Sequence, residues 1–138
     1  MSHTVCKSFK RELYEGIHDF RADVIKIALF TAAAAVNADT ATYGMVNEVS
    51  GAGYGAGGMT LAVSSGYPAI EGDLAVVRFD PATWPPLSTF TYRKALLYNA
   101  SKANRAIMAI DFGSDRGPVN GSWIIETPLS FPPLLLMS

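Results

Sequence analysis

The chain has 138 residues, a length that predicts a single domain with its own core. Hydrophobic residues make up 49% and charged residues only 17%, which favours a surface partly covered by other chains. The net charge of −1 argues against a nucleic-acid-binding protein. The longest strongly apolar run, residues 24–36, is interrupted by Lys26 and is too short to span a membrane.

The first 20 residues predict a helical arm. Apolar side chains recur every four positions, at Val5, Phe9, Leu13 and Ile17, which indicates an amphipathic helix over about residues 5–19. Charges throughout this segment leave no apolar core of a signal peptide, so we expect the chain to fold in a cytoplasm. The single cysteine, Cys6, excludes an internal disulfide.

From residue 23 onward the pattern is that of short β-strands. Alternating or continuous apolar residues predict strands at 23–31, 59–64, 74–79, 89–98, 105–112 and 122–127. The polar turn at 99–104 predicts a hairpin between its two flanking strands. Residues 80–87 contain three prolines and cannot form a central strand, because proline has no backbone donor. We therefore expect a mainly β chain, with residues 1–138 forming one antiparallel β-sandwich of jelly-roll or immunoglobulin-like order.

The segment 48–58, with sequence EVSGAGYGAGG, is the most informative part of the chain. Five glycines fall within eight residues, and Tyr54 lies among them. The absence of Ser/Gly repetition favours a loop of defined shape over a flexible linker. The glycines match the G-x-G-x-x-G pattern of dinucleotide-binding proteins, but a predicted strand follows them where that fold requires a helix. We therefore expect no nucleotide and no other cofactor.

Few residues suggest chemistry. The two histidines, His3 and His18, form no metal-ligand spacing with Cys, Asp or Glu, and no serine or cysteine lies in a nucleophile motif. We expect a protein that is not an enzyme and binds no metal. Five aromatic residues could instead stack on a sugar, although core packing explains most of them at less cost: Tyr54, Trp84, Tyr92, Tyr98 and Trp123. A carbohydrate-binding module is thus a distant alternative.

The C-terminal segment 128–138 is unusual. Pro132 and Pro133 favour an extended backbone, and an apolar run from Leu134 to Met137 follows. An apolar end of this kind could complete the domain's own sheet or lie on a neighbouring chain.

Several segments together resemble a family of small virion proteins of tailed bacteriophages. They are FKRELYEGIHDF at 9–20, KIALFTAAAA at 26–35, EVSGAGYGAGG at 48–58, ALLYNASKANRAIMAIDFGSD at 95–115 and WIIETP at 123–128. The resemblance spans most of the chain, and its most specific pieces are the glycine segment and YNASKANRA. Residues 128–138 extend beyond the length typical of the family.

The resemblance implies a non-enzymatic component of the virion. Its first implication is a capsid decoration, or cement, protein that binds the major capsid protein lattice and forms a homo-oligomer, with a trimer as the expected form. A tail, baseplate or fibre protein is the alternative. On this basis we expect contacts between chains from the helix, the glycine loop and the C-terminal segment, through Phe9, Leu13, Ile17, Gly53, Tyr54, Gly55, Gly57, Leu134, Leu135 and Leu136.

Overall fold

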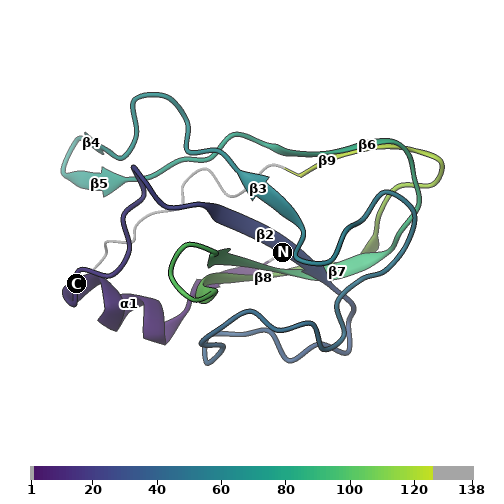
Figure 1. Ribbon diagram of the computed structural model, residues 1–138, viewed down its shortest axis with the longest axis horizontal. Helices are drawn as coiled ribbons and strands as arrows, with labels where there is room; N and C mark the ends of the chain where they lie inside the picture. Colours follow the sequence, from purple (N-terminus) through teal and green to yellow (C-terminus); the bar gives the residue numbers. More distant parts are fainter. Residues whose placement is uncertain (1, 126–138) are drawn as a thin grey trace.

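The computed structural model describes residues 2–125 (Figure 1). The chain is mainly β, with 47% strand and 7% helix, and it combines antiparallel sheets with one short helix. This confirms the expected class at that level. The elements are β1 (Ser2–Val5), α1 (Lys7–Tyr14), β2 (Ile25–Phe30), β3 (Met59–Leu61), β4 (Ala69–Glu71), β5 (Leu74–Val76), β6 (Ala82–Ser88), β7 (Tyr92–Asn99), β8 (Arg105–Arg116) and β9 (Gly121–Ile125). The extended segment expected at 128–138 lies outside the described residues.

A five-stranded antiparallel sheet is the centre of the fold. Its strand order is β1-β8-β7-β2-β3, and the expected hairpin at 99–104 joins β7 to β8 through the pair Asn99↔Arg105. The hairpin prediction is confirmed, but β8 runs on to Arg116 instead of ending at residue 112. A register shift between Tyr92 and Lys94 accommodates the extra residues of β8, including Gly113 at φ 84°.

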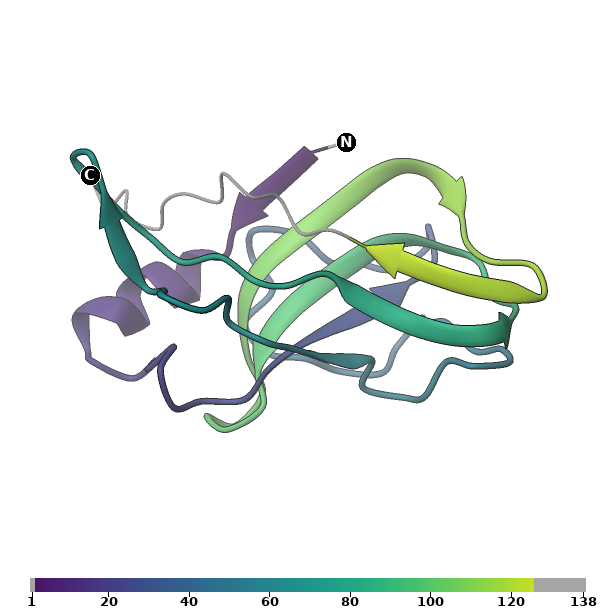
Figure 2. The ribbon, with the colours of Figure 1, turned by 90° about the horizontal axis from the view of Figure 1, so that it is seen from above.

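Two smaller sheets complete the fold. Among residues 2–125, strand β6 pairs with β9 alone, and the register shifts between Trp84 and Ser88, where Pro85 and Pro86 lie. The proline-rich segment is therefore a strand, but it lies in a two-stranded ribbon and not at the centre of a sheet. Strands β4 and β5 form a separate hairpin. Figures 1 and 2 both place α1 and this hairpin towards one end of the molecule and the β6–β9 ribbon towards the other.

The strands expected at 59–64 and 74–79 are shorter than predicted. Only Met59–Leu61 and Leu74–Val76 are regular. The remaining residues pair with each other irregularly, through the bridge Val63↔Phe79 and the backbone bonds from Ser64 N–H to Arg78 O and from Asp80 N–H to Ala62 O. The pairing edge of β3 therefore continues beyond the regular strand.

The helix is also shorter than expected, and the start of the predicted helix is a strand. Val5 lies in β1, which pairs with β8, because its apolar side chain suits a strand as well as a helix turn. The helix ends at Tyr14, followed by Gly16 at φ 72°. Gly16 N–H bonds Leu13 O and Ile17 N–H bonds Glu12 O, which is the Schellman arrangement of a glycine-terminated helix. Ile17 thus lies beyond the helix.

The core connects the helix, the sheet and the ribbon. Phe9 of α1, Ile27 and Leu97 of the sheet, and Trp84 of the ribbon are all fully or almost fully buried in one hydrophobic cluster. Burial of a side chain as large as Phe9 contributes about 2–3 kcal/mol. The helix is therefore packed into the domain and is not a detached arm.

Two substitutions on α1 test this packing. Phe9→Ala should lower the free energy of unfolding by about 3–5 kcal/mol, because it leaves a cavity in the core. Tyr14→Ala on the same helix should change it by about 0.5 kcal/mol or less, because that side chain is 79% exposed. Urea denaturation followed by tryptophan fluorescence measures both. Equal, small effects would mean that the helix is not part of the core.

Candidate functional site

The glycine segment 48–58 folds into a loop that lies closely against the sheet. Three of its glycines have positive φ: Gly53 at 84°, Gly57 at 94° and Gly58 at 80°. A Cβ atom on Gly58 would lie 1.8 Å from Ile27 O of β2, and one on Gly53 would lie 2.0 Å from Ser88 Oγ of β6. Only glycine permits both this backbone conformation and these close approaches. The loop therefore has a defined shape, as the sequence predicted.

The carboxylate of Glu48 holds this loop together. Its Oε1 accepts a hydrogen bond from Tyr43 Oη at 2.6 Å, and its Oε2 accepts bonds from Tyr54 Oη at 2.5 Å and Gly57 N–H at 2.8 Å. The loop thus binds an anion, but the anion is the chain's own side chain. Because Glu48 occupies the Gly57 N–H and β3 follows the glycines, the segment does not form the phosphate cradle that G-x-G-x-x-G denotes elsewhere.

Tyr54 connects the loop to the edge of the sheet. Pairing of β2 with β3 ends at Ile27↔Met59, and the N–H of Leu29 further along β2 donates to Tyr54 Oη at 2.9 Å. A second bond joins the loop to the sheet, since Tyr98 Oη of β7 donates to Gly57 O at 2.6 Å. The side chain of Tyr54 is therefore directed into this chain.

Burial keeps these tyrosine hydroxyls protonated. Burial has the largest influence on the pKa of Tyr54 and of Tyr43. Together with the bonds to Glu48, burial raises both pKa values far above the usual value of 10. Burial, with a further contribution from Glu48, raises the pKa of Tyr98 to about 12. The hydroxyls consequently remain hydrogen-bond donors over the whole physiological pH range.

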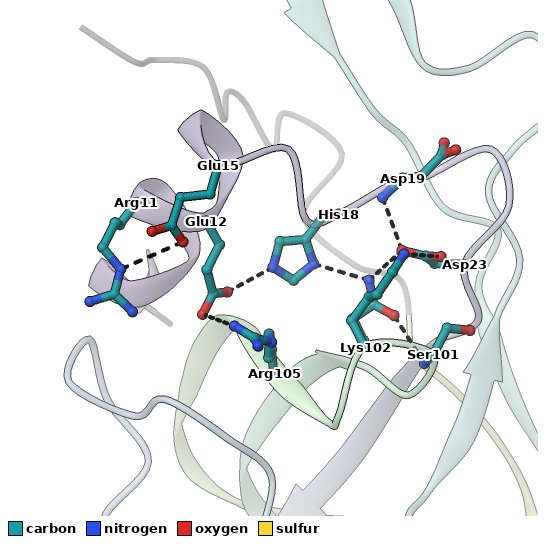
Figure 3. Close-up of polar contacts among 10 residues, drawn as sticks. Arg11, Glu12, Glu15, His18, Asp19, Asp23, Ser101, Lys102 and Arg105 are labelled. Atoms are coloured by element: carbon teal, nitrogen blue, oxygen red, sulfur yellow. Dashed lines mark hydrogen bonds and ion pairs between the residues drawn. The ribbon is translucent and has the colours of Figure 1, made fainter.

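A second polar cluster joins α1 to the β7–β8 turn (Figure 3). His18 Nε2 lies 2.8 Å from Glu12 Oε1, and His18 Nδ1 lies 3.0 Å from Asn99 Nδ2. Asn99 Nδ2 also donates to Asp23 Oδ2 at 2.8 Å. Lys102 Nζ donates to Asp23 at 2.8 Å. The side chains of Glu12, His18 and Asp23 are all at least nine-tenths buried.

The charges in this second cluster are paired. Arg105 Nη1 lies 3.3 Å from Glu12 Oε2, and Lys102 faces Asp23. Burial would raise the pKa of Asp23, but the bonds from Lys102, Asn99 and the Asp19 N–H outweigh it and lower the pKa to about 2. The cluster is therefore a saturated network of two carboxylates and two cations around His18 and Asn99.

Ser101 of the β7–β8 turn and Cys6 before the helix are the next groups to consider. The Oγ of Ser101 accepts the Val24 N–H at 2.9 Å. Burial, followed by the charge of Glu12, raises the pKa of Cys6 to about 12, so its thiol stays protonated. Within residues 2–125, no three His, Cys, Asp or Glu side chains are grouped as metal ligands.

The residues expected to contact other chains are widely distributed. Phe9 is wholly buried inside the chain, so the prediction that it lies on a contact surface of the folded chain is wrong. Leu13 and Ile17 are half-buried. Gly53 and Gly55 are exposed, whereas Gly57 is buried and Tyr54 is half-buried with its hydroxyl bonded internally. Leu134, Leu135 and Leu136 lie outside the described residues.

The expected sugar-stacking residues do not form a platform. Trp84 is wholly buried, and its ring lies near those of Tyr54 and Phe90. Trp123 is half-buried and donates its Nε1–H to Tyr92 Oη at 2.9 Å. These rings are part of the packing between the sheet and the ribbon.

Within residues 2–125, the large apolar side chains that are most exposed are ones that the sequence alone does not single out. Leu87 and Val119 are near the paired residues Ser88 and Gly121 of the ribbon, and Leu87 adopts φ 68°, a conformation rare for a branched residue. Further exposed apolar residues are Tyr14, Met45, Val46, Ile70 and Ile124. No sequence signal separates these from core residues, because the same residue types occur in both places.

Comparisons with protein-family models, curated protein sequences and solved structures find no match to this chain. No helix among residues 2–125 is long and apolar enough to cross a membrane.

Three alanine substitutions in the loop should differ in a defined order. Gly58→Ala should destabilise the fold by at least about 3 kcal/mol, because strain at positive φ is added to a clash with Ile27 O. Gly57→Ala should cost about 1–2 kcal/mol, because its Cβ would meet ordinary contacts and only the strain remains. Gly55→Ala, with open space around it, should change stability by about 0.5 kcal/mol or less. Chemical denaturation measures all three, and equal effects would mean a loop without defined shape.

The ion pair of Asp23 predicts acid sensitivity. The lowered pKa of Asp23 in the fold contributes stability above about pH 4, and this is lost as the pH falls towards 2. The contribution is about 1–2 kcal/mol, since Lys102 is partly exposed and solvent weakens the pair. Asp23→Asn should therefore destabilise the protein at pH 7 and flatten its stability between pH 4 and 2. If Asp23→Asn lost stability between pH 4 and 2 as steeply as the wild type, protonation of Asp23 would not be the cause of the acid sensitivity.

Proposed function

We propose that this chain is a non-enzymatic structural protein of a bacteriophage virion, most specifically a capsid decoration protein that binds the major capsid protein lattice. The proposal rests on how two segments fold in this chain, namely the two that most specifically resemble the family of virion proteins. EVSGAGYGAGG is fastened by Glu48, and YNASKANRA forms the hairpin end that contains Asn99. Both segments hold parts of the β scaffold together, because the Glu48 carboxylate and the Asn99 amide are bonded within the chain.

The exposed apolar residues support a role in assembly. Leu87 is 73% exposed at a strained backbone position, and Val119 and Ile124 are exposed on or beside the same ribbon. Strained residues that persist at a surface commonly serve a function. Many copies on a repeating lattice would combine weak contacts of this kind into stable attachment. We therefore propose the β6–β9 ribbon as a contact surface for the capsid protein.

The finer architecture belongs to the same proposal. The five-stranded sheet and the ribbon would be the two layers of an antiparallel β-sandwich, of either jelly-roll or immunoglobulin-like order. The chain would form a homo-oligomer, with a trimer suited to local threefold positions of a capsid. It would be located in the virion after synthesis in the cytoplasm of the host bacterium.

The two alternatives differ in what supports them. A tail, baseplate or fibre location fits the same scaffold and differs only in the partner. A sugar-binding module would require exposed aromatic rings, whereas Trp84 is buried and Tyr54 is bonded to Glu48. The burial of Trp84 and the internal bonding of Tyr54 therefore argue against the sugar-binding module.

Copy number distinguishes capsid from tail. Quantitative mass spectrometry of purified particles should find this chain in a constant ratio to the major capsid protein, in amounts sufficient to occupy a repeating lattice position. A copy number far below that of the capsid protein would reject the decoration role and favour the tail or baseplate.

Two surface variants test the proposed contact. Leu87→Asn should reduce binding to capsids at least about tenfold while keeping the fold, because Asn tolerates positive φ and removes the apolar contact. The matched control is Ile70→Asn on the β4–β5 hairpin, towards the other end, where the side chain is 78% exposed. Cosedimentation with capsids that lack the protein measures both. Equal binding by parent and Leu87→Asn would exclude the ribbon as the contact.

A further inference from the structure

The orientation of the Asn99 side chain determines the protonation of His18. Asn99 Oδ1 accepts the Ser101 N–H at 3.0 Å, so the amide nitrogen Nδ2 is on the side of Asp23 and His18. Its two hydrogens are donated to Asp23 Oδ2 at 2.8 Å and to His18 Nδ1 at 3.0 Å. The flipped amide would place its oxygen against the Asp23 carboxylate and its NH₂ against the Ser101 N–H, and both contacts would be repulsive.

The proton of His18 is consequently on Nε2. Because Nδ1 accepts from Asn99, it carries no hydrogen, and Nε2–H donates to Glu12 Oε1 at 2.8 Å. Both ring nitrogens are then satisfied only in the neutral imidazole. The side chain is wholly inaccessible to solvent, and the ring of Phe9 lies on it with centroids 4.7 Å apart. No water can replace a lost partner without opening this site.

The charges around His18 are balanced before any proton is added. Glu12 of α1 is paired with Arg105 of β8, and Asp23 is paired with Lys102 of the turn. A second proton on His18 would point its Nδ1–H at the Asn99 NH₂ and leave one uncompensated positive charge in the cluster. Glu12 favours that charge, but it already accepts the neutral ring's N–H and shares its own charge with Arg105. The repulsion at Asn99 has no comparable compensation.

We propose that His18 is a pH-sensitive latch that fastens α1 and the segment 15–24 to the β7–β8 turn. In its neutral form, His18 bridges Glu12 of the helix and Asn99 of the turn. Protonation breaks the bond to Asn99 and loosens the helix end from the sheet. The latch depends only on contacts within the chain and does not rest on the proposed virion role.

Nuclear magnetic resonance directly tests which nitrogen of His18 carries the proton. Long-range ¹H–¹⁵N correlation spectra of the wild-type protein at pH 7.5 should show His18 as the neutral ring with its proton on Nε2. A proton on Nδ1, or a doubly protonated ring at this pH, would overturn the proposal. This measurement needs no variant.

Unfolding equilibria between pH 7.5 and 5 test the latch itself, with His18→Gln as the informative variant. Glutamine can donate to Glu12 and accept from Asn99 but does not titrate. The folding equilibrium constant of the wild type should fall between pH 7.5 and 5, because a protonated His18 cannot accept the hydrogen bond from Asn99. His3→Gln, a change at the exposed histidine, should follow the wild type. His18→Gln should lack this fall, and the same pH dependence in all three proteins would refute the latch.

Discussion

The carboxylate of Glu48 is the interaction on which the irregular half of this fold depends. Residues 31–58 connect β2 to β3 without regular secondary structure beyond isolated bridges. Glu48 gathers two tyrosine hydroxyls and the Gly57 N–H, and Tyr54 in turn accepts the otherwise unpaired N–H of Leu29. Buried polar groups are costly unless they are bonded, so this network determines how the long connection lies on the sheet. Gly53 and Gly58 are required because the loop approaches β6 and β2 too closely there for a side chain.

The second network uses the same principle at the helix. A short helix of eight residues is marginal alone, and its attachment comes from Phe9 in the core and from Glu12 and His18 in the polar cluster. Asn99 uses its whole amide, since it accepts one bond and donates two. The result is a fully satisfied network between the helix and the β7–β8 turn. Such a network makes the attachment of the helix specific.

Part of this structure could be predicted from the sequence because its signals are local. Strand-like patterns of apolar residues on both sides of a polar turn predicted the β7–β8 hairpin. Three prolines excluded residues 80–87 from a central strand. The helix was predicted too long, because Val5 fits the apolar spacing of a helix while its backbone pairs with β8. Phe9 illustrates a further limit: an apolar helix face is the same whether it is covered by the chain's own core or by a partner.

The polar network around His18 could not be predicted, because it joins residues far apart in the chain. Glu12 and Arg105 are separated by 93 positions, and His18 and Asn99 by 81. Their types and spacing contain no pattern that brings them together. The glycine segment was recognised as shaped, yet the residue that shapes it, Glu48, is an ordinary glutamate at its beginning. Only the folded arrangement distinguishes this carboxylate from a solvated one.

The central functional claim is that this scaffold is attached to a capsid lattice. The most direct test is an electron-microscopy map of the intact particle in which the chain is located. We expect density for this fold over junctions between major capsid proteins, repeated across the shell, with the β6–β9 ribbon facing the lattice. A map that contains the chain only in the tail or baseplate, or lacks it, would contradict the claim.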